Sequence, residues 1–467
     1  MAAITWDPQT WAQQEFGNCQ LGDVRRNKRL MKIAVQIAAR PDGSTPDQTE
    51  TWGDLKATYR LFDTDDVTFQ GILEPHCLRT RSMCQAGEVK LIINDTTELD
   101  FGAKCRARGL GPVGNGHGRG FFVHSGLMLD AGSGQIEGLA GQEIFYRPPR
   151  GTKPLARNVR RRSSQRESIV WGKLIDRIGR PPQGVTWIHT CDRGADDYEV
   201  MLRAEQQGCG FLIRAAKLHR KIVTLAGQKT PLETWLAALP PQGERQIPVK
   251  ATAQEPARTA TVTLRFGEVC LPAPRVLTPW LKDHPRSTPL CVSVVELREM
   301  TPPPGCKAIR WVLYGTPEVA DVAAANLVIE YYERRPTIED FHKCYKTGCR
   351  VESRQYETAE RLERMAALHS VVAVRLMQMR TAAKETPDRP AAEVAPQAWV
   401  DMLRAVRKKV SPDMTIRTFV RQLAGLGGHL LRKGDGEPGW ITLWRGYEKL
   451  QLLLRGADAM KSQKRCG

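Results

Sequence analysis

The chain has 467 residues, which is too long for one ordinary domain and predicts roughly three, at about 150 residues each. Its 69 Lys and Arg residues against 51 acids give a formal net charge of +18, which favours a polyanionic partner, nucleic acid being the commonest. The N-terminus has no basic segment followed by an apolar run, and the longest apolar stretch, 370–377, is short and contains Arg375, so we expect a cytosolic protein with no membrane partner.

Residues 8–75 have the apolar spacing of helices. A basic cluster of Arg25, Arg26, Lys28 and Arg29 lies near the start of the second predicted helix, and a polar stretch at 41–51 breaks the pattern before a helix that contains Tyr59 and Arg60. Basic side chains on small helices suit contacts with phosphates and grooves. The alternative is a solvated helical cap.

Two apolar runs end in an aspartate. Residues 89–95 read VKLIIND and end at Asp95, and residues 185–192 read VTWIHTCD and end at Asp192. Buried strands deliver carboxylates to a sheet edge in this way. Between and after them the pattern predicts strands at 121–129, 138–146 and 210–214, and helices at 167–178 and 193–207.

The stretch GLGPVG at 109–114 has the spacing of a dinucleotide-binding motif. A strand follows it instead of the helix that would hold a pyrophosphate, so we interpret it as a loop between antiparallel strands. Further along, residues 218–317 are rich in proline, with strands expected at 259–270, 290–299 and 308–315. This pattern predicts an all-β insertion within an α/β domain.

Four side chains with polar or charged groups are spaced so that they share one face of a helix. Arg335, Glu339 and Lys346 follow Tyr332 by three, seven and fourteen residues, which places all four within about 60° of one helical face. A surface ladder of ion pairs is the alternative interpretation. Pro336 disfavours a straight helix at this point, so we expect a break, with Tyr332 and Arg335 before it and Glu339 and Lys346 after it.

The C-terminal part is predicted to be helical. A long helix is expected at 357–379 and a linker at 381–398. An apolar helical stripe follows, formed by Trp440, Leu443, Trp444, Tyr447, Leu450, Leu453 and Leu454. Such a stripe is either core or a dimer interface. The twelve cysteines are scattered without a CxxC pair, so we expect most of them to be reduced and structural.

Asp95, Asp192 and Glu339 are three carboxylates that can converge at one edge of a mixed sheet. Hard oxygen ligands of this kind suit Mg²⁺ or Mn²⁺, and two such ions about 3.5–4 Å apart can activate a water or a 3′-hydroxyl for phosphodiester transfer. In this interpretation Arg335 and Lys346 hold phosphates, and Tyr332 donates a hydrogen bond to one.

The chain resembles the DDE transposases of the insertion-sequence-four family over nearly its whole length. The most specific element is the signature Y-x2-R-x3-E-x6-K within YERRPTIEDFHKCYKTG. The segments INDTT around Asp95, CDRGAD around Asp192, LGDVRRNKRL and ATYRLF are also similar to the family's. Gly194 and Pro336 replace a glutamate and a tryptophan of a close relative, substitutions that other family members tolerate.

The resemblance implies three regions. These are a helical DNA-binding domain at 1–75, an RNase H-like catalytic domain at 76–380 with the β insertion, and a helical dimerisation domain at 381–467. It implies catalysis by Asp95, Asp192 and Glu339 with two Mg²⁺ ions, for which Mn²⁺ can substitute. The partners would be double-stranded DNA, as transposon ends and as target, and a second copy of the chain in a synaptic complex.

The implied reaction is cut-and-paste transposition, with strand cleavage, hairpin formation, hairpin opening and strand transfer. Trp311 would stack on a base flipped from the transposon end, although an ordinary strand tryptophan is the alternative. The resemblance also assigns DNA contacts to Arg214, Lys217, Arg25, Arg26, Arg29, Tyr59 and Arg60. Two other classes stay open, namely a non-catalytic DNA-binding regulator derived from a transposase, and an RNase H-like nuclease that cuts without joining ends.

Overall fold

The computed structural model describes residues 5–148, 159, 166–249, 251, 255–407, 413–432 and 435–465. Its N-terminal region is helical, as predicted, with α1 Pro8–Phe16, α2 Val24–Ala39, α3 Thr45–Gln48, α4 Trp52–Phe62 and α5 Phe69–Ser82. Each of these helices starts after a side chain that accepts a hydrogen bond from a free backbone amide, as Asp23 does from Arg25 at the start of α2. Residues 150–180 are rich in Lys and Arg, and part of this segment lies outside the described residues.

The central sheet begins with β1 Val89–Asp100, β2 Gly111–Val113, β3 Gly118–Asp130, β4 Ile136–Phe145, β5 Thr186–Cys191 and β6 Gly210–Arg214. β1 pairs antiparallel with β3 and parallel with β5, and β5 pairs parallel with β6. The glycine-rich stretch forms the β2–β3 hairpin, in agreement with the prediction of antiparallel strands there. Because β1 and β5 are parallel neighbours, their carboxyl ends meet at one edge of the sheet.

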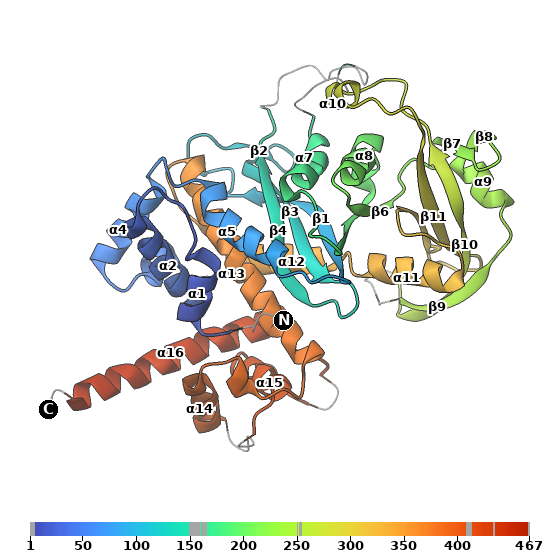
Figure 1. The fold of residues 1–467 in the computed structure, drawn as a ribbon. Coiled ribbons are helices and arrows are strands. Elements are labelled where there is room, and N and C mark those ends of the chain that lie inside the picture. Colours follow the sequence, from blue (N-terminus) through green and yellow to red (C-terminus); the bar gives the residue numbers. More distant parts are fainter. Residues whose placement is uncertain are drawn as a thin grey trace.

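Helices cover both faces of this part of the sheet (Figure 1). α5 and α13, Ala359–Glu385, pack on one face, while α7, Ile169–Ile178, and α8, Tyr198–Gln206, pack on the other. Successive residues of β1 therefore enter different cores, with Leu91 and Ile93 in the first and Ile92 in the second. A strand covered on both faces explains the continuous apolar run before Asp95.

The all-β prediction for 218–317 is wrong, because two short helices, α9 Leu232–Ala238 and α10 Pro279–Asp283, interrupt the strands. The strands are β7 Lys221–Thr224, β8 Lys229–Pro231, β9 Gly243–Val249, β10 Arg258–Leu271, β11 Leu290–Glu299 and β12 Arg310–Gly315. The frequent prolines made helices difficult to predict here. Proline at the first position of a helix is compatible with the helix, as Pro279 is in α10. β12 pairs with β6, so within the described residues the insertion extends the central sheet to twelve strands.

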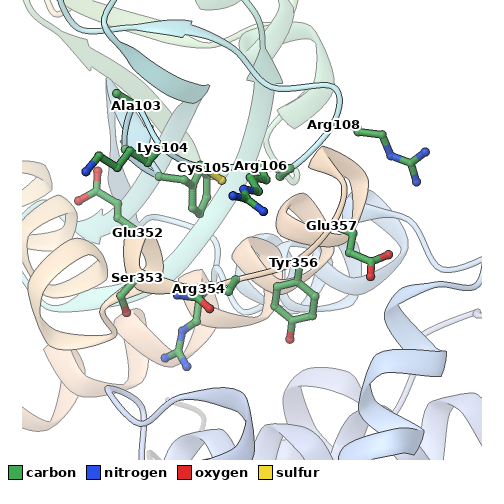
Figure 2. A pocket seen from close by; sticks show the side chains of 14 residues that line it. Ala103, Lys104, Cys105, Arg106, Arg108, Glu352, Ser353, Arg354, Tyr356 and Glu357 are labelled. Carbon is green, nitrogen blue, oxygen red and sulfur yellow. The ribbon is translucent and has the colours of Figure 1, made fainter.

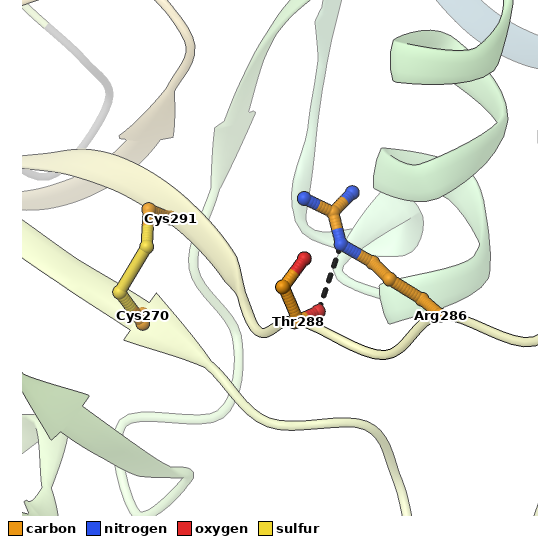
Figure 3. The surroundings of a disulfide bond; sticks show 4 residues. All are labelled: Cys270, Arg286, Thr288 and Cys291. Carbon is orange, nitrogen blue, oxygen red and sulfur yellow. Dashed lines mark hydrogen bonds between the residues drawn. A yellow bond between two sulfur atoms is a disulfide. The ribbon is translucent and has the colours of Figure 1, made fainter.

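Cys270 and Cys291 form a disulfide between neighbouring strands of the insertion (Figure 3). The two residues are directly opposite each other in the antiparallel pairing of β10 with β11, with their Cα atoms 4.0 Å apart. This pair is an exception to the expectation that most cysteines are reduced, which holds for nine other cysteines of the described residues. Spacing along the chain gave no sign of it, because the pairing depends on strand register.

The C-terminal third is helical, with α11 Val322–Glu333, α12 Thr337–Lys343, a π-helical turn Cys344–Gly348, α13, α14 Gln397–Val406, α15 Ile416–Leu426 and α16 Trp440–Arg465. The predicted break at Pro336 is present between α11 and α12. α13 continues to Glu385, so the predicted linker starts too early. In Figure 1 the far half of α16 projects away from the rest of the chain. None of the helices in the described ranges is long and apolar enough to span a bilayer.

Candidate catalytic site

Three separate elements deliver the predicted carboxylates to one place. Asp95 lies within β1, which does not end there as expected but continues to Asp100 because β3 still pairs with it. Asp192 directly follows β5, and the last parallel pair, Asn94 with Cys191, places the two aspartates side by side along the sheet edge. Glu339 lies in the first turn of α12, after the break at Pro336.

Arg335 joins these three carboxylates. Its Nη2 lies 2.8 Å from Asp95 Oδ2 and 3.8 Å from Asp192 Oδ2, and its Nη1 forms an ion pair with Glu339 Oε1. The three carboxylate side chains differ in exposure, with exposed fractions of 17% for Asp95, 39% for Asp192 and 60% for Glu339. The structure therefore brings together the three acids and one cation of the predicted site.

The electrostatics of the cluster depend on burial. Burial raises the pKa of Asp95 to about 6, although Arg335 and the Thr96 amide oppose this, and the nearby Asp192 and Glu339 charges add to it. Burial alone would lower the pKa of Arg335, but Asp95, Asp192 and Glu339 outweigh that effect and raise it. Arg335 therefore stays charged, and the cluster retains an excess of negative charge.

The donor chemistry of the cluster suits a hard divalent cation, since Asp95, Asp192 and Glu339 all offer carboxylate oxygens. Among the described residues, however, no group of three or more His, Cys, Asp or Glu side chains is arranged to hold a metal ion. The three carboxylates are arranged around the Arg335 guanidinium instead. The carboxylate side chains are of the type that binds Mg²⁺, but in this structure they are arranged around the Arg335 guanidinium.

An aromatic and cationic group adjoins the cluster. The Trp311 ring on β12 meets Tyr332 of α11 edge to face, with centroids 5.4 Å apart, and the Arg214 guanidinium lies 5.9 Å from the centroid of Trp311. Tyr332 is buried, and burial raises its pKa to about 12, so its hydroxyl stays protonated. The structure therefore places Trp311, Tyr332 and Arg214, three of the residues predicted to contact DNA, next to one another.

The two predicted lysines contact protein groups. Lys346 Nζ donates to the Glu98 carbonyl at 3.0 Å and pairs with Glu352 at 2.9 Å. Lys217 Nζ donates to the Asp196 carbonyl, and the Lys217 amide donates to the Asp196 carboxylate at 3.0 Å. The ion pair of Lys346 is therefore with Glu352 and not with one of the three clustered acids.

Asp196 is a residue that the sequence reasoning missed. Its side chain is fully buried and accepts from the Ala216 and Lys217 amides at 2.7 and 3.0 Å, and it pairs with Arg220 at 2.5 Å. Asp196 lies in the turn that carries Asp192, and these contacts connect this turn to the segment that follows Arg214. The available signal was the second acid of CDRGAD, four residues after Asp192.

The predicted N-terminal contacts lie on α2 and α4. Arg25 is 87% exposed and pairs with Asp23, Arg26 pairs with Asp66, and Arg29 pairs with Asp54. Tyr59 is 37% exposed and meets Tyr356 edge to face, and Arg60 is exposed. These side chains form a surface of their own, separate from the carboxylate cluster.

A cavity of about 1120 Å³ lies between residues 101–108 and 352–357. Figure 2 shows Lys104, Arg106 and Arg108 on one wall and Arg354 and Tyr356 on the other. Tyr356 also packs on Phe62 of α4, so the cavity lies where the N-terminal helices meet the sheet region. The sequence reasoning did not single out this basic wall.

A basic mixed α/β protein that gathers three carboxylates beside arginines and an aromatic ring has the chemistry of a DNA-processing enzyme. Two family models match the chain, one described as transposase DNA-binding over residues 8–67 and one as the Transposase Tn5 dimerisation domain over residues 371–467. The chain is a Tn5-like transposase, with a DNA-binding region at its N-terminus and a dimerisation region at its C-terminus. These two matches leave residues 68–370, which include the carboxylate cluster, uncovered.

Proposed function

We propose that this protein is a DDE transposase of the insertion-sequence-four family that carries out cut-and-paste transposition with an RNase H-like catalytic domain. The observation that supports the proposal is the convergence of Asp95, Asp192 and Glu339 from three separate elements beside Tyr332 and Trp311. The strand order β4-β3-β1-β5-β6, in which only β3 runs opposite to the others, supports the proposed catalytic fold.

The chemistry proposed for the site is phosphodiester transfer on double-stranded DNA. Water attacks the phosphorus at each transposon end and releases a 3′-hydroxyl, which then attacks the opposite strand to close a hairpin. Water reopens the hairpin, and the 3′-hydroxyl finally attacks a phosphorus of the target DNA. At every step the attacking oxygen loses a proton and the leaving oxygen of the broken ester gains one.

Asp95, Asp192 and Glu339 would hold two Mg²⁺ ions, or Mn²⁺ in their place, which supply Lewis acidity at the phosphate and acidify the attacking water. The chain's own cations would position the DNA, with Arg335, Lys346, Arg214 and Lys217 as phosphate contacts. Trp311 would stack on a base unstacked from the strained end, with Tyr332 supporting its ring from the side. The dimer would bring two ends together in a synaptic complex.

The test uses full-length protein and the inverted repeats expected to bracket its coding region. Asp95→Asn, Asp192→Asn and Glu339→Gln should each reduce Mg²⁺-dependent cleavage by about 1000-fold or more while end binding persists, because each removes a ligand worth several kcal/mol of charge stabilisation. Cleavage is followed on labelled DNA, and binding by gel shift.

Asp340→Asn is the matched control. Asp340 is adjacent to Glu339 on α12 but pairs with Arg380, so cleavage should continue in this variant. Retained cleavage in one of the three test variants would remove that residue from the catalytic set. Specific end binding by the unaltered protein without nicking in Mg²⁺ or Mn²⁺ would favour the non-catalytic regulator instead.

A further inference from the structure

Arg335 occupies an unusual position for a residue that would hold a phosphate. Its side chain is only 15% exposed, and it forms ion pairs with the three carboxylates of the candidate site. Its Nε is buried without a hydrogen-bond partner among the described residues. An arginine buried in this way neutralises the acids but does not satisfy all its own donors.

Most of the carboxylate oxygens that would bind a metal ion already have a partner. Asp95 Oδ2 accepts from Arg335, and Asp95 Oδ1 accepts from the Thr96 amide at 2.9 Å. Asp192 Oδ1 likewise accepts from the Gly194 amide at 2.7 Å, and Asp192 Oδ2 lies 3.8 Å from Arg335 Nη2. A divalent cation and the guanidinium therefore need the same oxygens and the same negative charge, so the two must compete.

We propose that Arg335 is a positioning residue that serves as an internal counter-ion, which divalent metal displaces and thereby releases to bind a DNA phosphate. This inference rests on the proposed function. Without metal, the positive charge of Arg335 offsets the repulsion among the three carboxylates of the site. With metal, the guanidinium loses its carboxylate partners, and a phosphate offers it the same bidentate geometry.

The geometry of the turn favours this exchange. Arg335 lies between α11 and α12, so a change in its side-chain direction leaves both helices intact. The neighbouring Tyr332, Trp311 and Arg214 form the surface on which the DNA end is proposed to lie. Because linkage is reciprocal, metal must then tighten DNA binding by the same factor as DNA tightens metal binding.

The first experiment measures Mn²⁺ binding to the full chain without DNA, from the electron paramagnetic resonance signal of free Mn²⁺. Arg335→Gln should bind Mn²⁺ about 10-fold more tightly than the unaltered protein, because the competing charge is gone. Arg335→Lys keeps the charge and should fall between the two. Arg334→Gln is the matched control, because Arg334 contacts the Gly132 carbonyl and lies outside the cluster, and its Mn²⁺ affinity should not change.

The second readout is thermal stability. Arg335→Gln should melt below the unaltered protein in EDTA and regain the difference in Mn²⁺, because the metal replaces the missing positive charge. A purely structural arginine would lower the melting temperature equally in both conditions. That equal loss would overturn the inference, and so would unchanged or weaker Mn²⁺ binding in Arg335→Gln.

The third readout is coupling to DNA. A short duplex that carries the inverted repeat should raise the Mn²⁺ affinity of the unaltered protein, with little effect on Arg335→Gln. Equal coupling in both proteins would contradict the release of Arg335. Asp192→Asn separates the two proposals. If it abolishes Mn²⁺ binding while Arg335→Gln has no effect, the counter-ion role fails alone, and if it leaves Mn²⁺ binding unchanged, the metal site of the proposed function fails.

Discussion

At the residue scale, Glu385 shows how burial controls a carboxyl outside the carboxylate cluster. It ends α13, and burial raises its pKa to about 7 despite the charges of Lys384 and Arg334. The folded chain therefore keeps a proton on Glu385 at pH values at which the unfolded chain has lost it. The contribution of this group to stability is present below its ordinary value of 4.5 and is lost as the pH rises through about 7.

Glu385→Gln should therefore raise the melting temperature at pH 8 by about 1–3 °C, with a smaller effect at pH 5. Differential scanning calorimetry across pH 5–8 measures the difference. Glu393→Gln is the control, since Glu393 is half exposed and forms a surface pair with Arg389. An equal change for both variants at all pH values would contradict the burial explanation.

The residue types of the candidate site could be predicted from the sequence, whereas several of their contacts could not. The acids Asp95 and Asp192 follow apolar runs that form neighbouring parallel strands, and this pairing places them side by side although β1 continues past Asp95. Arg335 and Lys346 were expected on phosphates, yet in this structure both pair with carboxylates. Some of their contacts are distant in sequence, since the Asp95 carboxylate lies 240 residues from Arg335 and the Glu98 backbone carbonyl lies 248 residues from Lys346, and no local pattern encodes such a contact.

At the element scale, the buried Asp196 carboxylate connects two segments of the site. One segment is the turn after β5 that carries Asp192, and the other follows β6 and carries Lys217. Asp196→Asn keeps the shape but removes the charge that pairs with Arg220, and breaking a buried pair costs about 3–5 kcal/mol. Residues 214–220 should then exchange amide hydrogens faster, as measured by mass spectrometry.

Asp197→Asn provides the comparison for this prediction. Asp197 caps α8 by accepting from the Glu199 amide at 3.0 Å, so its loss should loosen the start of α8 and leave 214–220 unchanged. If Asp196→Asn produced the same exchange pattern as Asp197→Asn, the connection between the two segments would be refuted.

The elements that the sequence predicted best were those with strong local signals. Pro336 ends one helix and starts another, and the strand at 290–299 has the expected bounds. The failures came from tertiary pairing. β1 continues past Asp95 because β3 extends beside it, and α13 extends past residue 379 because its last turns remain partly buried. The local secondary-structure propensity of a segment carries no information about packing partners that are distant in sequence.

At the scale of the whole molecule, the segment just before the first matched region contacts the second matched region. The Trp6 amide donates to the Val394 carbonyl at 2.7 Å, and the Trp6 ring lies 5.4 Å from Phe419 of α15. The buried Arg375 donates to the Trp6 carbonyl at 2.5 Å and to the Tyr447 hydroxyl at 3.2 Å. Arg375 is also the charge that interrupts the longest apolar run, and its partners explain how the fold accommodates it.

The last helix has two apolar sides with different surroundings. Leu443, Tyr447 and Leu450 are buried against the rest of the chain, so this part of the predicted stripe is core. On the outer surface of α16, Leu452 is 62% exposed and Met460 is 66% exposed. Both residues lie in the dimerisation match, and the far half of α16 projects away from the rest of the chain (Figure 1).

We therefore predict that Leu452→Glu combined with Met460→Glu weakens dimerisation at least 10-fold, because an unpaired charge is costly to bury in an interface. Sedimentation equilibrium over a range of protein concentrations measures the dissociation constant. Leu225→Glu is the control, since Leu225 is 69% exposed in the insertion, outside both matched regions. An unchanged dissociation constant in the double variant, or an equal change in the control, would show that the dimer uses another surface.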